Sequence, residues 1–294
     1  MKTHFSTRSL RSCARLAALA VMEITLAASG FSPSTQAQTS TAQAPLNPSP
    51  PPQAVAAGYT RLAFDEEFTS TNGIDMNDTG EPGFNFYRRR PFGSVEPANF
   101  ISVSKGVLTL TSSRSSNLGL VSICRKGRGW TGFAATNGAY FEASVSFDPA
   151  VRASGWPSFW TMAAEHLYGG VNSNYLEIDF FEYDTLPFKA GGTNTYGGAI
   201  HVWTGRTETN NQAHDRFLVK VPESTDWKNS FNTVGTLWVP GAGIDYYFNN
   251  TLTTDTNSYR EFPRFLIGDS DHMPVILGSD GWPMKVDWVR VWQK

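Results

Sequence analysis

Three carboxylates lie within six residues of an otherwise apolar segment, Tyr175–Tyr183 (YLEIDFFEY). Alternate side chains of a strand share a face, so Glu177 and Asp179 point to one side and the apolar residues to the other. Glu182 follows five residues after Glu177 and would point into the apolar side, where a lone carboxylate is costly. A β-bulge at Phe180-Phe181 would return it to the face of the other two acids. The segment therefore predicts a bulged strand with three acids on one surface.

Such a row of acids has a definite chemistry. Neighbouring carboxylates repel one another, and the repulsion raises the pKa of at least one of them. Near neutral pH one acid then carries a proton while another is ionised, as cleavage of a glycosidic bond requires. Two other interpretations stay open from the spacing alone: a site for a hard cation such as calcium, or a solvated acidic strand. The two bulky phenylalanines do not suit a metal-binding loop.

The composition indicates what kind of scaffold holds this segment. The 294 residues are 40% apolar, 13% aromatic and 17% charged, with 26 glycines. Low charge with many aromatic residues and glycines is typical of β-rich domains, and it excludes a disordered chain, a coiled coil and a helical repeat array. The formal net charge of −2 offers no basic surface to nucleic acid.

Several segments read as antiparallel strands. Residues 140–147 alternate between an apolar side, which includes Phe141 and Phe147, and a polar side that we expect to be wet. Turns at Lys105-Gly106 and at residues 240–243 predict two hairpins, and residues 286–292 form a strong final strand. We therefore predict an all-β fold of two stacked antiparallel sheets.

The first part of the chain is not expected to belong to this fold. Residues 1–37 combine a basic start, an apolar run and a small-x-small ending, the layout of a secretory signal peptide, so we expect a secreted protein without membrane contact after its removal. Residues 38–58 are rich in proline and alanine and read as a linker, leaving 59–294 as the folded domain. Cys124 is then the only cysteine, and we expect it to be buried.

Glu177-Ile178-Asp179-Phe180-Phe181-Glu182 resembles the E-x-D-x-x-E signature of glycoside hydrolase family 16. Further segments resemble that family in the same order along residues 61–293: Phe64–Phe68, Asn99–Leu110, Gly138–Ala143, Gly155–Trp160 and Val286–Trp292. The resemblance implies a β-jelly-roll sandwich with a concave sugar-binding cleft and a retaining, double-displacement mechanism. By position, Glu177 would be the nucleophile, Glu182 the general acid/base, and Asp179 the residue that holds the nucleophile in place.

The extra residue in the motif is similar to the bulged branch of the family, with its laminarinase-like and agarase- or carrageenase-like members. The resemblance therefore implies an endo-acting enzyme on a β-1,3-glucan or a galactan. Weaker candidates for contact with the sugar, each with a structural role as the alternative, are Trp156, Trp160, His201, Trp203, Asn99 and Trp130. Arg88-Arg89-Arg90 reads as a solvated loop, or as a site for sulfate groups of an anionic galactan. Glu165 and His166 depart from the family pattern and have no explanation at this level.

Catalysis of this type requires no cofactor. The resemblance does imply a structural calcium ion away from the acids, held by Glu67, the Gly106 carbonyl and Asp287. The expected partner is a polysaccharide, and we expect the protein to be a monomer. A carbohydrate-binding protein without turnover and a transglycosylase are the alternatives on the same fold.

Overall fold

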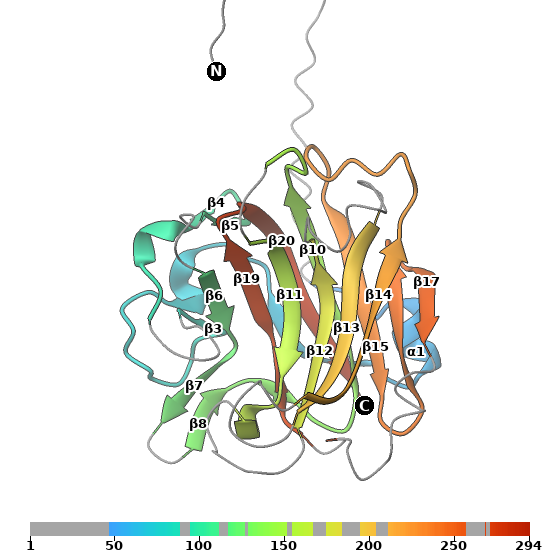
Figure 1. Ribbon diagram of the computed structural model, residues 1–294. Helices are drawn as coiled ribbons and strands as arrows, with labels where there is room; N and C mark the ends of the chain where they lie inside the picture. The colour runs from blue at the N-terminus through green and yellow to red at the C-terminus, as the bar shows by residue number, and fades with distance from the viewer. Residues whose placement is uncertain are drawn as a thin grey trace, which may run out of the picture. The chain divides into compact units, whose positions relative to one another are not determined.

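Two large β-sheets form the fold. The supporting sheet has the strand order β17-β16-β15-β10-β20-β5-β4, with β1 also paired to β20, and the acid-bearing sheet has the order β14-β13-β12-β11-β19-β6-β3-β2. Figure 1 shows β11, β12, β13 and β14 side by side in front of β10 and β20. Among the described strands every pairing is antiparallel except the short β2–β3 pair. The prediction of an all-β sandwich is therefore confirmed.

The computed structural model describes residues 47–88, 95–111, 117–126, 129–151, 155–166, 175–183, 195–203, 211–256, 268 and 271–294, all in one compact unit, residues 43–294. The supporting sheet consists of β1 (Arg61–Glu66), β4 (Ile101–Ser104), β5 (Val107–Leu110), β10 (Ala139–Phe147), β15 (Asn232–Val239), β16 (Gly243–Phe248), β17 (Thr251–Thr256) and β20 (Met284–Gln293). The acid-bearing sheet consists of β2 (Ile74–Asp75), β3 (Phe86–Tyr87), β6 (Asn117–Val121), β11 (Pro157–Met162), β12 (Tyr175–Glu182), β13 (Thr195–Trp203), β14 (Asn211–Lys220) and β19 (Ile276–Asp280). Two small pairs, β7 (Ile123–Lys126) with β8 (Gly129–Gly132) and β9 (Ala134–Ala135) with β18 (Met273–Pro274), and the short helices α1 (Pro52–Ala56), η1 (Thr71–Gly73) and η2 (Ala98–Phe100) complete the described elements.

Aromatic side chains from the two sheets meet in the core. Phe141 of β10 stacks on Phe180 of β12 with ring centroids 4.5 Å apart, and Phe147 lies 5.7 Å from Phe181. Cys124 is buried and free, as expected. The predicted hairpins are present, and Lys105 and Gly106 both adopt positive φ in the β4–β5 turn. The predicted strand over residues 286–292 is the middle of β20.

The outer side of β10 differs from the expectation of a wet face. Every residue of this strand is buried, including Glu142 and Ser144. Part of the cover comes from the N-terminal segment, because Ala54 of α1 and Tyr59 cluster with Tyr140 and with Leu237 and Trp292. β10 is a central strand, so its polar side chains are enclosed on both sides rather than solvated.

The N-terminal boundary of the fold also lies earlier than expected. Residues 51–58, assigned to the linker from their composition, contain α1, and Gln53 Nε2 donates hydrogen bonds to the Tyr140 hydroxyl (2.6 Å) and to Asn250 Oδ1 (3.0 Å). Proline at the first helical position is compatible with a helix start, so the proline run begins α1 instead of forming a spacer. The predicted signal peptide, 1–37, and the beginning of the predicted linker lie outside the described residues. No helix in the described ranges has both the length and the apolar character needed to cross a membrane.

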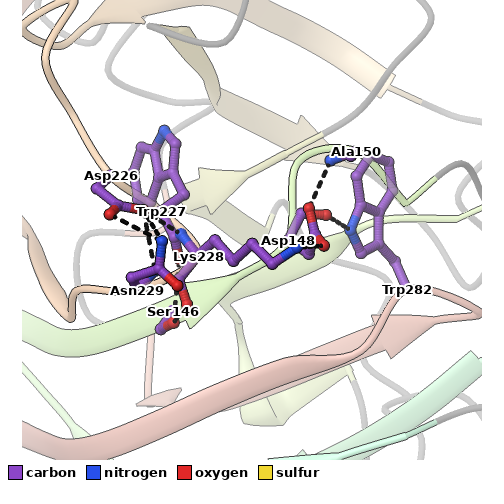
Figure 2. A network of polar contacts seen from close by, with 8 residues as sticks. All are labelled: Ser146, Asp148, Ala150, Asp226, Trp227, Lys228, Asn229 and Trp282. Atoms are coloured by element: carbon purple, nitrogen blue, oxygen red, sulfur yellow. Dashed lines mark hydrogen bonds and ion pairs between the residues drawn. The ribbon is translucent and has the colours of Figure 1, made fainter. Parts of the chain in front are cut away.

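A polar network supports the core behind the acid-bearing strand (Figure 2). Lys228 Nζ lies 2.7 Å from Asp148 Oδ2, and the Trp282 indole donates to the Asp148 carbonyl at 2.9 Å. The carbonyl of Trp227 accepts hydrogen bonds from Ser146 Oγ (3.0 Å) and from the amide of the next residue of β10 (2.8 Å). These contacts hold the Trp227 ring in the core, 5.7 Å from the ring of Phe181.

Candidate active site

The predicted bulge is present in β12. Asp179 is opposite Ala199 of β13 and Glu182 is opposite Gly197, so β12 takes three steps where its partner takes two. The pairing with β11 shows the same extra residue, because Asp179 and Phe181 are two positions apart in β12 while their partners are adjacent in β11. A bulge of this kind places two successive residues on one face of the sheet.

The two phenylalanines of the motif show why the bulge forms. Phe180 packs on Phe141 and Phe159, and Phe181 packs on Phe147 and Tyr196, so both rings enter the core between the sheets. Two consecutive inward rings leave Glu182 on the outward face, with Glu177 and Asp179. Burial of two aromatic side chains gives the irregular strand its stability.

Two tryptophan side chains hold the outer acids. The indole of Trp156 donates a hydrogen bond to Glu182 Oε1 at 2.8 Å, and the indole of Trp203 donates to Glu177 Oε2 at 2.6 Å. Both tryptophans therefore lie at the acid row, and their contact with a sugar stays a prediction. The structure adds a role that the sequence did not indicate, because each indole also fixes the orientation of one carboxylate.

Asp179 lies between these two acids and is the most enclosed of the three. His201 Nε2 lies 3.4 Å from Asp179 Oδ2, and the His201 ring stacks on Trp203 with centroids 5.2 Å apart. Asp179 also shares a hydrogen bond with Glu177.

The pKa values separate the roles of the acids. Burial raises the pKa of Glu182 to about 8, and the charge of Asp179 is the next largest cause. The Trp156 hydrogen bond acts in the opposite direction and lowers the pKa. Burial also raises the pKa of Asp179 to about 7, while the charge of Arg216 and the hydrogen bond with Glu177 lower it. Glu182 consequently carries a proton at neutral pH, which is the state that a general acid requires.

The sequence analysis missed one charged residue near the acids, Arg216 of β14. Asp179 is paired with Ala199, and Ala199 is paired with Arg216, so the three lie in one row across the sheet. Paired residues project from the same face, and the small side chain of Ala199 separates Arg216 from the acids. Only the register of β13 on β14 reveals this placement, and the sequence carries no signal for that register.

Trp160 is also on this face of the acid-bearing sheet. It is the β11 partner of Asp179, is half-buried and packs against the core. β11 continues to Met162, so Trp160 lies within a strand, and a short turn begins at Ala164.

A second group of side chains lies near the Glu177 end of β12. Glu165 pairs with His272, and Trp130 of β8 contacts the His272 ring edge to face at 5.5 Å. His166 stacks on Tyr175 with centroids 3.8 Å apart. These contacts account for Glu165 and His166, which the sequence alone left unexplained.

Two other residue groups from the sequence are placed by the structure, and the sugar contact of Asn99 stays a prediction. Asn99 is exposed in η2, which leads into β4 of the supporting sheet rather than into the acid-bearing sheet. Arg88 is buried and its guanidinium donates to the carbonyl of Glu96, so it is not part of a solvated loop. Arg89 and Arg90 lie outside the described residues.

The acids themselves are a poor calcium site. One donor atom each of Glu177, Asp179 and His201 lie within 4.8 Å of one another, but this group contains an imidazole nitrogen and excludes Glu182. Calcium prefers six to eight oxygen ligands. The geometry therefore favours proton transfer chemistry over a hard-cation site.

Calcium binding at Glu67, Gly106 and Asp287 stays a prediction. Glu67 Oε1 accepts hydrogen bonds from Arg290 Nη2 at 2.6 Å and from Arg290 Nε at 3.1 Å. A cation at this carboxylate would compete with the guanidinium. The donor set at Glu67 therefore suits an ion pair better than a metal.

No family model matches the sequence, and neither does any curated protein. Solved structures do match. Porphyranase B from Zobellia galactanivorans is 15% identical with a TM-score of 0.51, and the match covers 79% of this chain and 92% of that one. The laminarinase catalytic domain from Thermotoga maritima MSB8 is 16% identical with a TM-score of 0.52, covering 80% and 98% of the two chains. An endo-1,3-β-glucanase from Streptomyces sioyaensis is 15% identical with a TM-score of 0.52, covering 84% and 98%. The chain therefore has the β-jelly-roll sandwich fold of these three proteins.

Proposed function

We propose that the protein is a secreted, endo-acting glycoside hydrolase of family 16 that cleaves a β-linked polysaccharide with retention of configuration. The observation that carries the proposal is the bulge of β12, which brings Glu177 and Glu182 onto one face. The motif resemblance and the shared fold with a laminarinase and a porphyranase support the same activity. They favour a β-1,3-glucan or a galactan as substrate.

The proposed reaction has two steps, with roles carried over from the motif. Glu177 attacks the anomeric carbon while Glu182 gives its proton to the glycosidic oxygen, so the leaving sugar departs as an alcohol. Glu182, now ionised, takes a proton from water, and the resulting hydroxide displaces Glu177 from the glycosyl ester. Glu182 ends protonated and Glu177 ionised, ready for another turnover. The two glutamates and one water molecule supply all the reacting groups of these steps.

The test is activity on a panel of laminarin, mixed-linkage glucan, agarose and carrageenan. We expect reducing ends to appear from at least one polymer, with early products that are long chains and, by NMR, retain the anomeric configuration. Binding to a polymer without any release would identify a carbohydrate-binding protein instead. Products longer than a supplied oligosaccharide would identify a transglycosylase.

Two substitutions test the residue roles. Glu177→Gln and Glu182→Gln should leave the fold intact and lower kcat by about 10²-fold or more, the usual worth of such groups. Azide should restore turnover to Glu177→Ala and yield a glycosyl azide of inverted configuration. Near-normal activity of Glu177→Gln would contradict the assigned nucleophile.

Secretion and the monomeric state belong to the same proposal. Sequencing the N-terminus of protein recovered from the culture medium should show a mature chain that begins near Gln38. Light scattering on the purified protein should give the mass of one chain.

A further inference from the structure

Three segments that are distant in the sequence meet beside the start of β12. The amide of His272 donates to Glu165 Oε2 at 3.0 Å, and the His272 Nδ1 atom pairs with Glu165 Oε1. The indole of Trp130 contacts the His272 ring edge to face, with ring centroids 5.5 Å apart. We call Trp130, Glu165 and His272 the Trp130 cluster.

Backbone hydrogen bonds tie the Trp130 cluster to the strand that carries the acids. The Ala164 amide donates to the His272 carbonyl at 2.7 Å, and the Leu176 amide donates to Asp271 Oδ2 at 2.8 Å. Leu176 directly precedes Glu177. On the other side, the pairing of Met273 with Ala135 joins β18 to β9, the strand that follows β8 and its Trp130.

The cluster is open to solvent although its geometry is well defined. The His272 side chain is 42% exposed and that of Glu165 is 32% exposed, while Trp130 is half-buried with part of its ring against the core. An exposed ion pair adds little stability by itself. His272 makes two hydrogen bonds to the Glu165 carboxylate at the surface, next to the Trp130 indole. We explain them by the need to hold this indole in one orientation.

An indole beside a carboxylate and an imidazole matches the chemistry of a neutral sugar. The flat apolar ring suits the C–H face of a pyranose, and the polar groups can bond to its hydroxyls. We propose that Trp130 is the stacking surface of a sugar subsite at the Glu177 end of the acid row, and that Glu165 and His272 are positioning residues for its ring. This inference rests on the proposed function, because it names a place where the same polysaccharide chain is bound.

The subsite should be visible as a dependence on chain length. With trisaccharides and octasaccharides of the polymer that the wild-type protein cleaves, Trp130→Ala should lower the ratio of octasaccharide to trisaccharide kcat/KM by about tenfold, mainly through KM. Glu165→Ala should lower the ratio in the same direction by a smaller factor. Trp130→Tyr should recover much of the ratio, because it restores an aromatic face. Trp288→Ala is the matched control: its ring lies under Arg290 on the supporting sheet, and the ratio should not change.

Folding is checked by thermal unfolding, and binding is measured separately by calorimetry in the Glu177→Gln background with the same octasaccharide and with laminarin. A folded Trp130→Ala protein with a wild-type ratio and wild-type octasaccharide affinity would overturn the inference, even if the proposed function held. Should no polymer be cleaved while laminarin binding depends on Trp130, the proposed function would fail and the subsite would stand.

Discussion

At the residue scale, the row of acids is organised by hydrogen bonds that assign a state to each carboxylate. Glu182 Oε1 accepts the Trp156 indole hydrogen, which leaves Oε2 free of this contact. Glu177 accepts a hydrogen bond from Trp203 and is hydrogen-bonded to Asp179. One acid is therefore set as a proton donor, while the assigned nucleophile is stabilised by two neighbours.

Burial is the main cause that raises the pKa of Glu182 to about 8, and the charge of Arg216 is one of the smaller effects that lower it. The general acid must be protonated, so activity should fall as pH rises through the Glu182 pKa of about 8. Arg216→Met removes the lowering effect, and we expect the alkaline limb of the kcat/KM profile to move to higher pH. Arg216→Lys, which keeps the charge, should leave the limb near its original position. If the alkaline limb did not move in Arg216→Met, a group other than Glu182 would determine its position.

At the element scale, the bulge in β12 depends on the aromatic side chains that pack behind it in the core. Its bulge is stabilised by Phe180 on Phe141 and by Phe181 on an aromatic group that includes Trp227. The Ser146 hydrogen bond to the Trp227 carbonyl holds the Trp227 segment in place, and the exposed Asp148–Lys228 pair lies next to it (Figure 2). The position of Glu182 is thus determined by packing in the interior as well as by its own contacts.

Truncation of one inward ring tests this dependence. Phe180→Ala leaves a cavity between the sheets and should lower the free energy of unfolding by about 3–5 kcal/mol, measured with urea. It should also lower kcat, because the bulge that orients Glu182 loses its packing. Phe231→Ala is the control, since Phe231 is 39% exposed and its truncation should change stability little. Full activity of a folded Phe180→Ala protein would contradict the coupling.

At the scale of the whole molecule, the outer side of the supporting sheet is closed by the N-terminal segment and carries buried polar groups. Glu142 accepts the Trp292 indole hydrogen at 2.7 Å and is 4% exposed. Burial raises the pKa of Glu142 from 4.5 to about 7, against the lowering effects of Trp292 and Arg290. The folded protein therefore keeps a proton there that the unfolded chain has already released.

This difference makes stability depend on pH with a definite sign. Between pH 4.5 and 7 the folded state binds more protons at Glu142 than the unfolded state, so the free energy of unfolding falls as pH rises. Glu142→Gln cannot ionise, and relative to wild type it should gain roughly 3 kcal/mol between the two ends of that range. Urea unfolding at pH 4.5 and at pH 7 measures the change. An equal wild-type-to-variant difference at both pH values would refute the buried, protonated state of Glu142.

The sequence alone was sufficient for the properties that depend on local alternation and on the cost of burying charge. A lone carboxylate cannot stay among the apolar residues of β12, so the bulge and the shared face of Glu177, Asp179 and Glu182 follow from the segment itself. The strands and hairpins follow from alternation and turn residues in the same way. The tertiary structure decided the contacts between segments far apart in the chain: Arg216 beside the acids, α1 on the supporting sheet, and the pairing of Glu165 with His272, which are 107 residues apart. These depend on the register of one strand on another and on the space left between side chains, and neither is encoded within a single segment.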